Sequence, residues 1–118
     1  MTFSQVNTDH IGKDMQTYLS RHARENGIYL YYEEPDEMYV YLHGMNSLQG
    51  ENSIYYTDFS VKANADTLEI HYSSNKTSDY SDRTLAREGL YKVHLDKKYS
   101  TIQAFHNGEE VPFNDISS

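Results

Sequence analysis

The first periodic pattern along the chain has the spacing of a helix. Between Thr8 and Asn26, apolar and aromatic residues recur every three or four positions, which places them in one stripe of an α-helix. The stripe consists of Ile11, Met15, Tyr18, Leu19 and His22. Asn7 or Thr8 can cap the first turn, and Asn26-Gly27 provides a left-handed stop. The pattern therefore predicts one amphipathic helix early in the chain.

After Gly27 the period of the pattern changes from 3.6 to two, which is the period of a β-strand. Aliphatic side chains alternate with tyrosines over residues 28–32 and again over 38–43, and an acidic segment that contains Pro35 separates the two runs. We therefore predict a hairpin with its loop centred on Asp36. Matching aliphatic with aliphatic residues pairs Tyr32 with Val40 and Leu30 with Leu42.

The same alternation gives this hairpin an aromatic face. Tyr29, Tyr31, Tyr39 and Tyr41 all have the parity opposite to that of the aliphatic residues. In the predicted register Tyr31 lies opposite Tyr41, and Tyr29 lies opposite His43. We expect these five side chains to form one cluster.

A second hairpin is predicted from Ser53–Ala63 and Thr67–Ser73, with Asn64-Ala65 in its loop. The expected pairs are Phe59 with Ile70 and Val61 with Leu68. The earlier apolar residues of the first strand, Ile54 and Tyr56, have the opposite parity to Phe59 and Val61. A β-bulge near Thr57-Asp58 is therefore needed if both halves of the strand face one core.

The last third of the chain shows the strongest turn signal, Asn107-Gly108. Counting outward from this turn pairs Ala104 with Val111 and Ile102 with Phe113, and counting across residues 97–100 pairs Leu95 with Ile102. These pairs predict one apolar ladder across three strands. Pro112 has no backbone N–H for a ladder, so we expect the strand Glu109–Phe113 to lie at a sheet edge.

These elements predict an α+β fold in which one N-terminal helix precedes an antiparallel meander of about seven strands. The pattern leaves an open sheet, a sandwich and a partial barrel as alternatives. The 118 residues suit a single domain spanning 1–118. Residues 73–89 read as a long polar loop, in which only Leu85, in a short helical turn, is expected to be anchored.

Composition then narrows the classes of function. The net charge of −8 opposes binding to nucleic acid phosphates and to anionic lipid. No run is long and apolar enough to span a membrane. Met1–Val6 lacks the features of a signal peptide, so we expect a cytoplasmic protein, or an exported one whose leader is absent from this sequence. The absence of cysteine excludes disulfides and thiolate chemistry.

Candidate catalytic chemistry is sparse. The six histidines are at least twelve positions apart, without the short spacing of zinc ligands. A close approach of His43 to His71, or of His94 to His106, is conceivable but is better interpreted as ordinary cross-strand packing. The acidic segment Glu33–Glu37 reads as a solvated turn. We predict no catalytic residues, no metal site and no cofactor, and therefore no enzyme.

The twelve tyrosines are the unusual feature. Tyrosine suits recognition surfaces, because it offers a large contact area and a polar tip. The tyrosine face is either an exposed binding platform or the surface on which the helix packs, and the sequence leaves both open. The polar loop 73–88 is the second candidate contact region, through Asp79, Tyr80 and Asp82. We predict a non-enzymatic module that binds another protein through the tyrosine face, His43 and this loop.

Two other functions compete with this prediction. The first is an acidic decoy or inhibitor that occupies a basic nucleic-acid-binding groove, which the small size and negative charge allow. It requires a continuous negative stripe on the surface. The second is a small-ligand carrier or enzyme that uses a concave part of the sheet, with Glu33, Tyr41 and His43 as the nearest polar groups. It requires a deep pocket with convergent polar groups.

Overall fold

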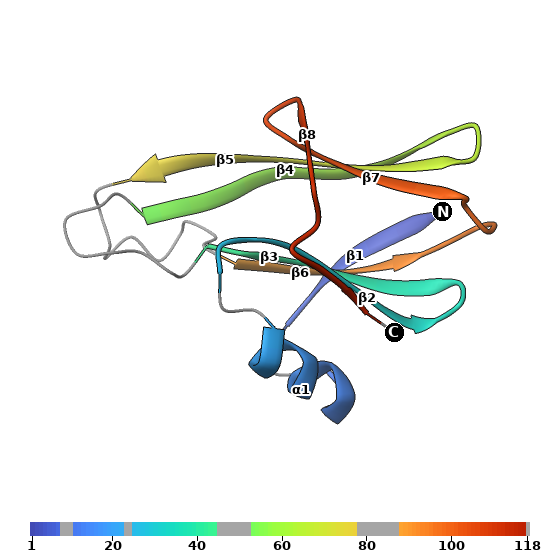
Figure 1. Cartoon of the computed structure of the whole chain (residues 1–118), viewed down its shortest axis with the longest axis horizontal. Helices are drawn as coiled ribbons and strands as arrows, with labels where there is room; N and C mark the ends of the chain where they lie inside the picture. Colours follow the sequence, from blue (N-terminus) through green and yellow to red (C-terminus); the bar gives the residue numbers. More distant parts are fainter. Residues whose placement is uncertain (8–10, 23–24, 45–52, 78–87, 118) are drawn as a thin grey trace.

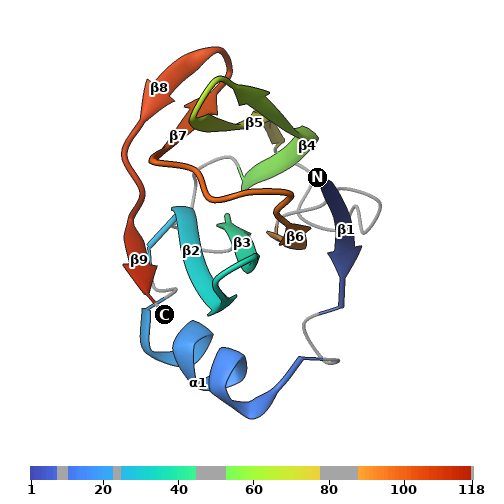
Figure 2. The ribbon, with the colours of Figure 1, turned by 90° about the vertical axis from the view of Figure 1, so that its right-hand side faces the viewer.

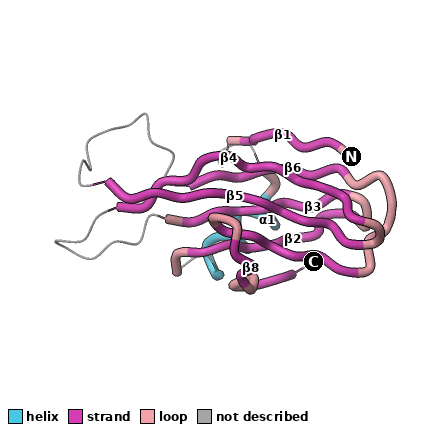
Figure 3. The backbone as a smooth tube through the Cα atoms, turned by 90° about the horizontal axis from the view of Figure 1, so that it is seen from above, coloured by secondary structure: helices cyan, strands magenta, loops and turns pink. Residues whose placement is uncertain are grey.

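The structure is a computed structural model of the chain, and it describes residues 1–7, 11–22, 25–44, 53–77 and 88–117. In this part of the chain two β-sheets lie one above the other, and a single helix lies beneath the lower sheet (Figure 1). We call the lower one sheet A and the upper one sheet B. Viewed from above, the strands of both sheets run roughly along the long axis of the molecule (Figure 3).

Sheet A has five strands, and sheet B has four. The order in sheet A is β1 (Thr2–Val6), β6 (Glu88–His94), β3 (Glu37–His43), β2 (Gly27–Glu34) and β9 (Asp115–Ser117). The order in sheet B is β4 (Ser53–Asn64), β5 (Thr67–Thr77), β7 (Thr101–His106) and β8 (Glu109–Val111). Two of the pairings, β2 with β9 and β5 with β7, are parallel, so both sheets are mixed.

The main core fills the space between the two sheets. The alternation that begins at Ile28 turns one row of aliphatic side chains of β2 and β3 toward sheet B, as the period of two requires. Leu30, Val40 and Met38 are completely buried in this row. Leu68, Ile70 and Ala104 are buried from the opposite side. Burial of these residues holds the two layers together.

A second core lies between sheet A and the helix α1 (Lys13–His22) (Figure 2). Met15 and Tyr18 of the helix are buried there, and Ile11 and Leu19 pack around them. The predicted stripe therefore faces the sheet through Ile11, Met15, Tyr18 and Leu19, although the helix is shorter than the expected Thr8–Asn26. Gly27, with a φ of 151°, begins β2.

The predicted class is confirmed only in its coarse form: the described chain is mostly β, with one short helix and no closed barrel. The simple antiparallel meander is wrong. The chain crosses between the sheets after β3, β5, β6 and β8, and after β8 it descends from sheet B to place β9 beside β2 (Figures 1 and 2). Strand β1 precedes the helix, and neither β1 nor β9 was expected.

Both predicted hairpins form, but each has a register two residues from the expected one. Leu30 pairs with Val40, and Tyr31 pairs with Tyr39. In the second hairpin Val61 pairs with Ile70 and Ala63 pairs with Leu68. An even shift keeps every side chain on its predicted face. The faces were therefore correct and the individual partners were wrong.

The bulge and the last turn are confirmed. The register of β4 with β5 shifts between Thr57 and Ser60, and Asp58 there has a φ of 57°. At the Asn107-Gly108 turn Ala104 pairs with Val111, and β8 is an edge strand that ends just before Pro112.

The predicted ladder across three strands is wrong. The pairing of Leu95 with Ile102 does not form, because β6 belongs to sheet A and β7 to sheet B. Phe113 lies beyond the end of β8 and is not a strand partner of Ile102. The polar loop predicted at 73–89 is replaced at its start by β5, which continues to Thr77, and the turn expected around Leu85 lies outside the described residues.

Candidate functional site

The helix covers the tyrosine face of sheet A. Tyr29, Tyr39 and Tyr41 are only 2%, 7% and 4% exposed, and Tyr31 is half-buried. All four pack in the second core with Met15 and Tyr18. Of the two interpretations that the sequence left open, the structure has the one in which the helix covers this face. A partner could reach most of these rings only if the helix moved away.

The hydroxyl groups of Tyr29 on the covered face and of Tyr18 on the helix have hydrogen-bond partners inside the protein. The Tyr29 hydroxyl donates to the Glu25 carbonyl oxygen over 2.7 Å and accepts from the Glu25 N–H over 3.2 Å. The Tyr18 hydroxyl donates to the Leu30 carbonyl oxygen, and its ring lies 5.0 Å from that of Tyr31. Burial raises the pKa of Tyr18, with a smaller contribution from Asp115. These bonds make the tyrosine face a structural element.

His43, the fifth predicted contact residue, lies at the end of this face. The Tyr41 hydroxyl donates to Glu88 over 2.5 Å, and it lies 3.1 Å from Nδ1 of His43. Burial raises the pKa of Tyr41, and Glu88 adds to this effect. Burial also lowers the pKa of His43, which Glu88 partly opposes. His43 is therefore neutral at pH 7 and participates in a partly buried polar cluster.

The two histidines with lowered pKa predict a pH dependence of stability. Burial lowers the pKa of both His43 and His106 below that of an unfolded histidine, about 6.5. The unfolded chain therefore binds more protons once the pH falls below about 6.5. We expect the free energy of unfolding to decrease from pH 7 to pH 5.5 and the loss to level off below the folded pKa values.

Urea denaturation at several pH values checks this expectation. The double variant His43→Gln/His106→Gln should show a flatter profile between pH 7 and pH 5.5, because glutamine does not titrate. His94→Gln is the control, since His94 is exposed on β6, with Nδ1 of its ring 3.3 Å from the carboxylate of Glu37. A wild-type protein that gains stability on acidification over this range would contradict the prediction.

The second predicted contact region cannot be placed. Asp79, Tyr80 and Asp82 lie outside the described residues, as does most of the segment 73–88. The predicted contact residues are thus divided between a covered face and this segment. The structure brings Tyr29, Tyr31, Tyr39, Tyr41 and His43 together as predicted, but under the helix.

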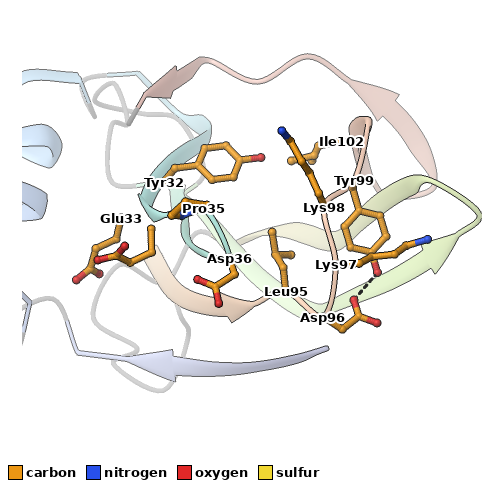
Figure 4. A pocket seen from close by; sticks show the side chains of 11 residues that line it. Tyr32, Glu33, Pro35, Asp36, Leu95, Asp96, Lys97, Lys98, Tyr99 and Ile102 are labelled. Carbon is orange, nitrogen blue, oxygen red and sulfur yellow. Dashed lines mark hydrogen bonds between the residues drawn. The ribbon is translucent and has the colours of Figure 1, made fainter.

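An open site exists elsewhere, at the end of the sandwich where β2 turns into β3 and β6 crosses to β7 (Figure 4). It has a volume of about 700 Å³, and we call it the end cleft. One wall is the β2–β3 turn, and the other is the connection 95–100. The residues that line it are Tyr32, Glu33, Glu34, Pro35, Asp36, Leu95, Asp96, Lys97, Lys98, Tyr99 and Ile102.

Hydrogen bonds hold the walls of the end cleft in place. The Leu95 N–H donates to the Asp36 carbonyl oxygen over 2.7 Å, which joins the two walls. The connection is also tied to the β4–β5 turn, because the Ser100 N–H donates to the Asp66 carbonyl oxygen over 2.9 Å. Lys97 donates to the Ala65 carbonyl oxygen over 3.0 Å. The two walls of the cleft are therefore tied to each other, and the connection 95–100 is also tied to a turn of sheet B.

The floor of the end cleft is apolar. Leu95 is 6% exposed, and the partly buried Tyr32, Tyr99 and Ile102 pack against the main core. In Figure 4 the Tyr32 ring points toward Lys98 across the opening. Burial raises the pKa of Tyr32, so its hydroxyl stays protonated and can donate a hydrogen bond.

The polar groups of the end cleft divide into paired and unpaired ones. The Tyr99 hydroxyl donates to Asp96 over 2.7 Å, and the ammonium of Lys97 lies 3.4 Å from the carboxylate of Asp66. Glu33 lies 4.0 Å from Lys92. The remaining polar side chains have no partner within the described structure. They are Tyr32, Glu34, Asp36 and Lys98.

No group of three metal-binding side chains occurs among the described residues. The two conceivable approaches, His43 to His71 and His94 to His106, do not appear as contacts. His71 stacks on Phe105 and bonds Glu69, and His106 stacks on Tyr72. His106 also bonds the Ser74 hydroxyl, a contact between residues 32 positions apart that sequence reasoning missed. A serine beside a histidine can act as a nucleophile. This pair, however, does not line the end cleft.

Sequence reasoning found one wall of the end cleft and missed the other. It interpreted the acidic turn Glu33–Glu37 as solvated and named only Glu33 from it, in the small-ligand alternative. Lys98, Tyr99 and Ile102 were not candidates, because their position beside this turn depends on the crossing between sheets. One local signal could have indicated this second wall. The sequence Asp-Lys-Lys-Tyr at 96–99 places an aromatic ring within a charged turn.

The chain has no significant match among protein-family models, curated proteins or solved structures. Any assignment of function therefore depends on the geometry of the site. Within the described residues, no helix has the length and apolar character that crossing a membrane requires.

Proposed function

We propose that this protein is a non-enzymatic recognition module whose end cleft binds a segment of another protein. The bound segment carries an apolar side chain next to a basic one. One observation supports the proposal above all: an apolar floor lies beside carboxylates that have no partner in the described structure. The tyrosine face does not take part, because the helix covers it.

The charges of the end cleft determine the chemistry of the partner. Carboxylates outnumber ammonium groups four to two in its lining, and the ammonium of Lys97 already interacts with Asp66. Glu34 and Asp36 are exposed on the turn and are available to a lysine or arginine of a partner. The net charge of −8 adds a longer-range attraction for a basic protein surface.

The apolar floor determines where the segment anchors. An aromatic or branched aliphatic side chain that covers Leu95 and Ile102 would remove apolar surface from water, which is the main source of binding free energy in such sites. Tyr32 and Lys98 can donate hydrogen bonds to the backbone carbonyl groups of the same segment. Because the cleft walls are tied together by hydrogen bonds, little ordering entropy is lost on binding.

Selection from a random heptapeptide library displayed on phage tests this proposal. We expect enrichment of peptides in which lysine or arginine neighbours an aromatic or branched aliphatic residue. The double variant Glu34→Gln/Asp36→Asn should weaken binding of a selected peptide about tenfold, since each exposed ion pair contributes up to about 1 kcal/mol. Calorimetric titration gives the affinities.

The matched control is Glu109→Gln/Glu110→Gln in β8, which removes the same charge from an exposed site outside the cleft lining. It should change the affinity less than about twofold, because only the screened long-range attraction is lost. Equal effects of the two double variants would contradict a specific site in the end cleft. Failure to enrich any peptide, or enrichment of acidic peptides, would also overturn the proposal.

The size of the cleft favours a second candidate function, the binding of a small organic molecule. Its volume of about 700 Å³ lies within the range of small-molecule sites, about 300–1,000 Å³. Such a ligand would place an apolar ring on Leu95 and Ile102 and an acceptor near Tyr32 and Lys98. A fragment screen by ligand-observed NMR that finds binders, together with a failed peptide selection, would favour this candidate.

The acidic-decoy alternative receives less support. A decoy requires a continuous row of carboxylates, but Lys92 lies 4.0 Å from Glu33 and 3.5 Å from Glu37. A basic group therefore interrupts the acidic turn at its base. Lys98 adds a second positive charge to the lining of the same cleft.

A further inference from the structure

We infer that strand β1 is a self-association surface, on which a second copy of this chain adds its own β1 in antiparallel orientation. The inference concerns the edge of sheet A and is independent of the end cleft. It rests on the exposed edge of β1, the composition of that strand and the aromatic cluster behind it.

Strand β1 is the outer strand of sheet A, and the described structure pairs it only with β6 (Figures 2 and 3). All five of its residues are in regular register with β6. The outer edge of such a strand presents backbone N–H and C=O groups that form hydrogen bonds with another extended chain. Residues 2–5 are exposed, so access to this edge is open.

The other sheet edges have features that discourage pairing, and β1 does not. Strand β8 is short and is followed by Pro112, and β9 has only three residues, including the charged Asp115. Strand β4 is interrupted by the bulge at Asp58. Natural sheets use prolines, charges, short strands and bulges to prevent association of their edges. Thr2–Val6 has none of these protections.

An exposed ring lies beside the unprotected edge. Phe3 is 42% exposed, although its ring centroid lies only 5.2 Å from that of Phe59 of β4. The Phe59 ring stacks on Tyr91 of β6 with centroids 3.7 Å apart. This cluster closes the side of the sandwich between the two sheets but leaves Phe3 uncovered. A strand added to β1 would cover this ring.

Self-pairing suits the sequence of β1. A two-fold axis at Ser4 would place Ser4 of one copy opposite Ser4 of the other, and Phe3 opposite Gln5. No like charges would face each other, which is the main penalty for pairing identical strands. The two Phe3 rings would lie on the same face as diagonal neighbours, a spacing of about 7 Å that aromatic side chains can bridge. A second copy is therefore the occupant that we propose.

Sedimentation velocity over a range of concentrations in about 0.3 M salt tests the inference, because this salt screens the repulsion between two chains of charge −8. We expect a weak dimer, since one added strand buries less area than a typical stable complex. Ser4→Lys should raise the dissociation constant about fivefold or more, because identical charges would then face each other. A chain that stays monomeric throughout would overturn the inference.

Opposite charges placed at position 4 of two variants distinguish self-pairing from other effects of substitution. The Ser4 side chain is exposed, so Ser4→Lys and Ser4→Glu should both fold. Each variant alone should dimerise at least about fivefold more weakly than the wild type, and an equimolar mixture should regain the wild-type affinity, because a lysine then faces a glutamate. Ile116→Lys, on the opposite edge of sheet A, is the control and should dimerise like the wild type. A mixture that stays monomeric would contradict the two-fold pairing.

Cross-linking between two copies tests whether the two-fold axis lies at Ser4. The chain has no cysteine, so Ser4→Cys introduces a single thiol. Residues directly opposite in an antiparallel pair have Cα atoms about 4.5 or 5.5 Å apart, within the range for a disulfide, about 4.4–6.8 Å. Mild oxidation should give a covalent dimer of Ser4→Cys at least about tenfold faster than of Ile116→Cys. Equal rates would place the contact elsewhere and overturn the inference.

Discussion

Replacing Leu30 by alanine is expected to lower the free energy of unfolding by about 3 kcal/mol. Leu30 is completely buried at the centre of the core between the sheets, in a strand that has neighbours on both sides. Truncation removes apolar atoms from the core and leaves a cavity. Strand β2 cannot move to fill this cavity, because it is hydrogen-bonded to β3 on one side and to β9 on the other. Chemical denaturation monitored by tyrosine fluorescence gives the value.

Ile116→Ala provides the matched control for this substitution. Ile116 pairs with Leu30 in the parallel register of β2 and β9, and it loses the same number of carbon atoms. It is 55% exposed, so we expect a loss of less than about 1 kcal/mol. Similar losses at the two positions would mean that sheet B does not cover this part of sheet A.

Replacing Gly27 by alanine is expected to cost about 2–4 kcal/mol, as the sum of backbone strain and lost hydrogen bonds. Gly27 has a φ of 151°, and a Cβ atom there would collide with the side chain of Asn114. That side chain accepts from the Ile28 N–H over 3.1 Å, and the Asn114 N–H donates to the Ile28 carbonyl oxygen over 2.8 Å. The substitution would thus loosen the segment that carries β9.

The variant Gly108→Ala separates the backbone strain from the loss of hydrogen bonds. Gly108 also has a positive φ, 85°, but an added Cβ would meet no atom within 4 Å. We expect only the strain of the turn, about 1–2 kcal/mol. In an Asn114→Ala background, the additional cost of Gly27→Ala should decrease, because the collision is removed. Additive effects of Gly27→Ala and Asn114→Ala would contradict the proposed clamp on β9.

The faces of the strands could be predicted from the sequence, because the period of two is a local property. Ile28, Leu30 and Val40 share a face whatever the exact pairing is. The register could not be predicted in the same way, since a shift of two residues leaves the faces unchanged. In the first hairpin, the register also changes between Tyr32 and Glu34, close to the turn, and the alternation gave no sign of this irregularity.

The division into two sheets could not be predicted, because no local pattern distinguishes a hairpin from a crossing between sheets. The segment between Leu95 and Ile102 has turn residues in either case. Strand β1 escaped prediction for another reason: its two apolar residues, Phe3 and Val6, have opposite parity and show no alternation. The parallel pairings of β9 and β7 join segments far apart in the chain, and no short-range signal specifies them.

The candidate site could likewise be predicted only where it depends on local sequence patterns. The tyrosine face was found because alternation is local, and the helix stripe that covers it was also found. Whether the tyrosine face is exposed or covered depends on packing, and the hydrogen bond from Tyr18 of the helix to Leu30 of β2 shows that the helix is docked on sheet A. The end cleft combines a turn of sheet A with a connection to sheet B, so only the three-dimensional arrangement reveals it.

The central claim is that recognition takes place in the end cleft and not on the tyrosine face. The most direct measurement is a titration of the ¹⁵N-labelled protein with a peptide from the phage selection, followed by amide chemical shifts. The account predicts that the largest shifts fall in residues 32–36 and 95–102, while Tyr29, Tyr39 and Tyr41 stay unchanged. Largest shifts in the helix Lys13–His22 and in those three tyrosines would contradict it.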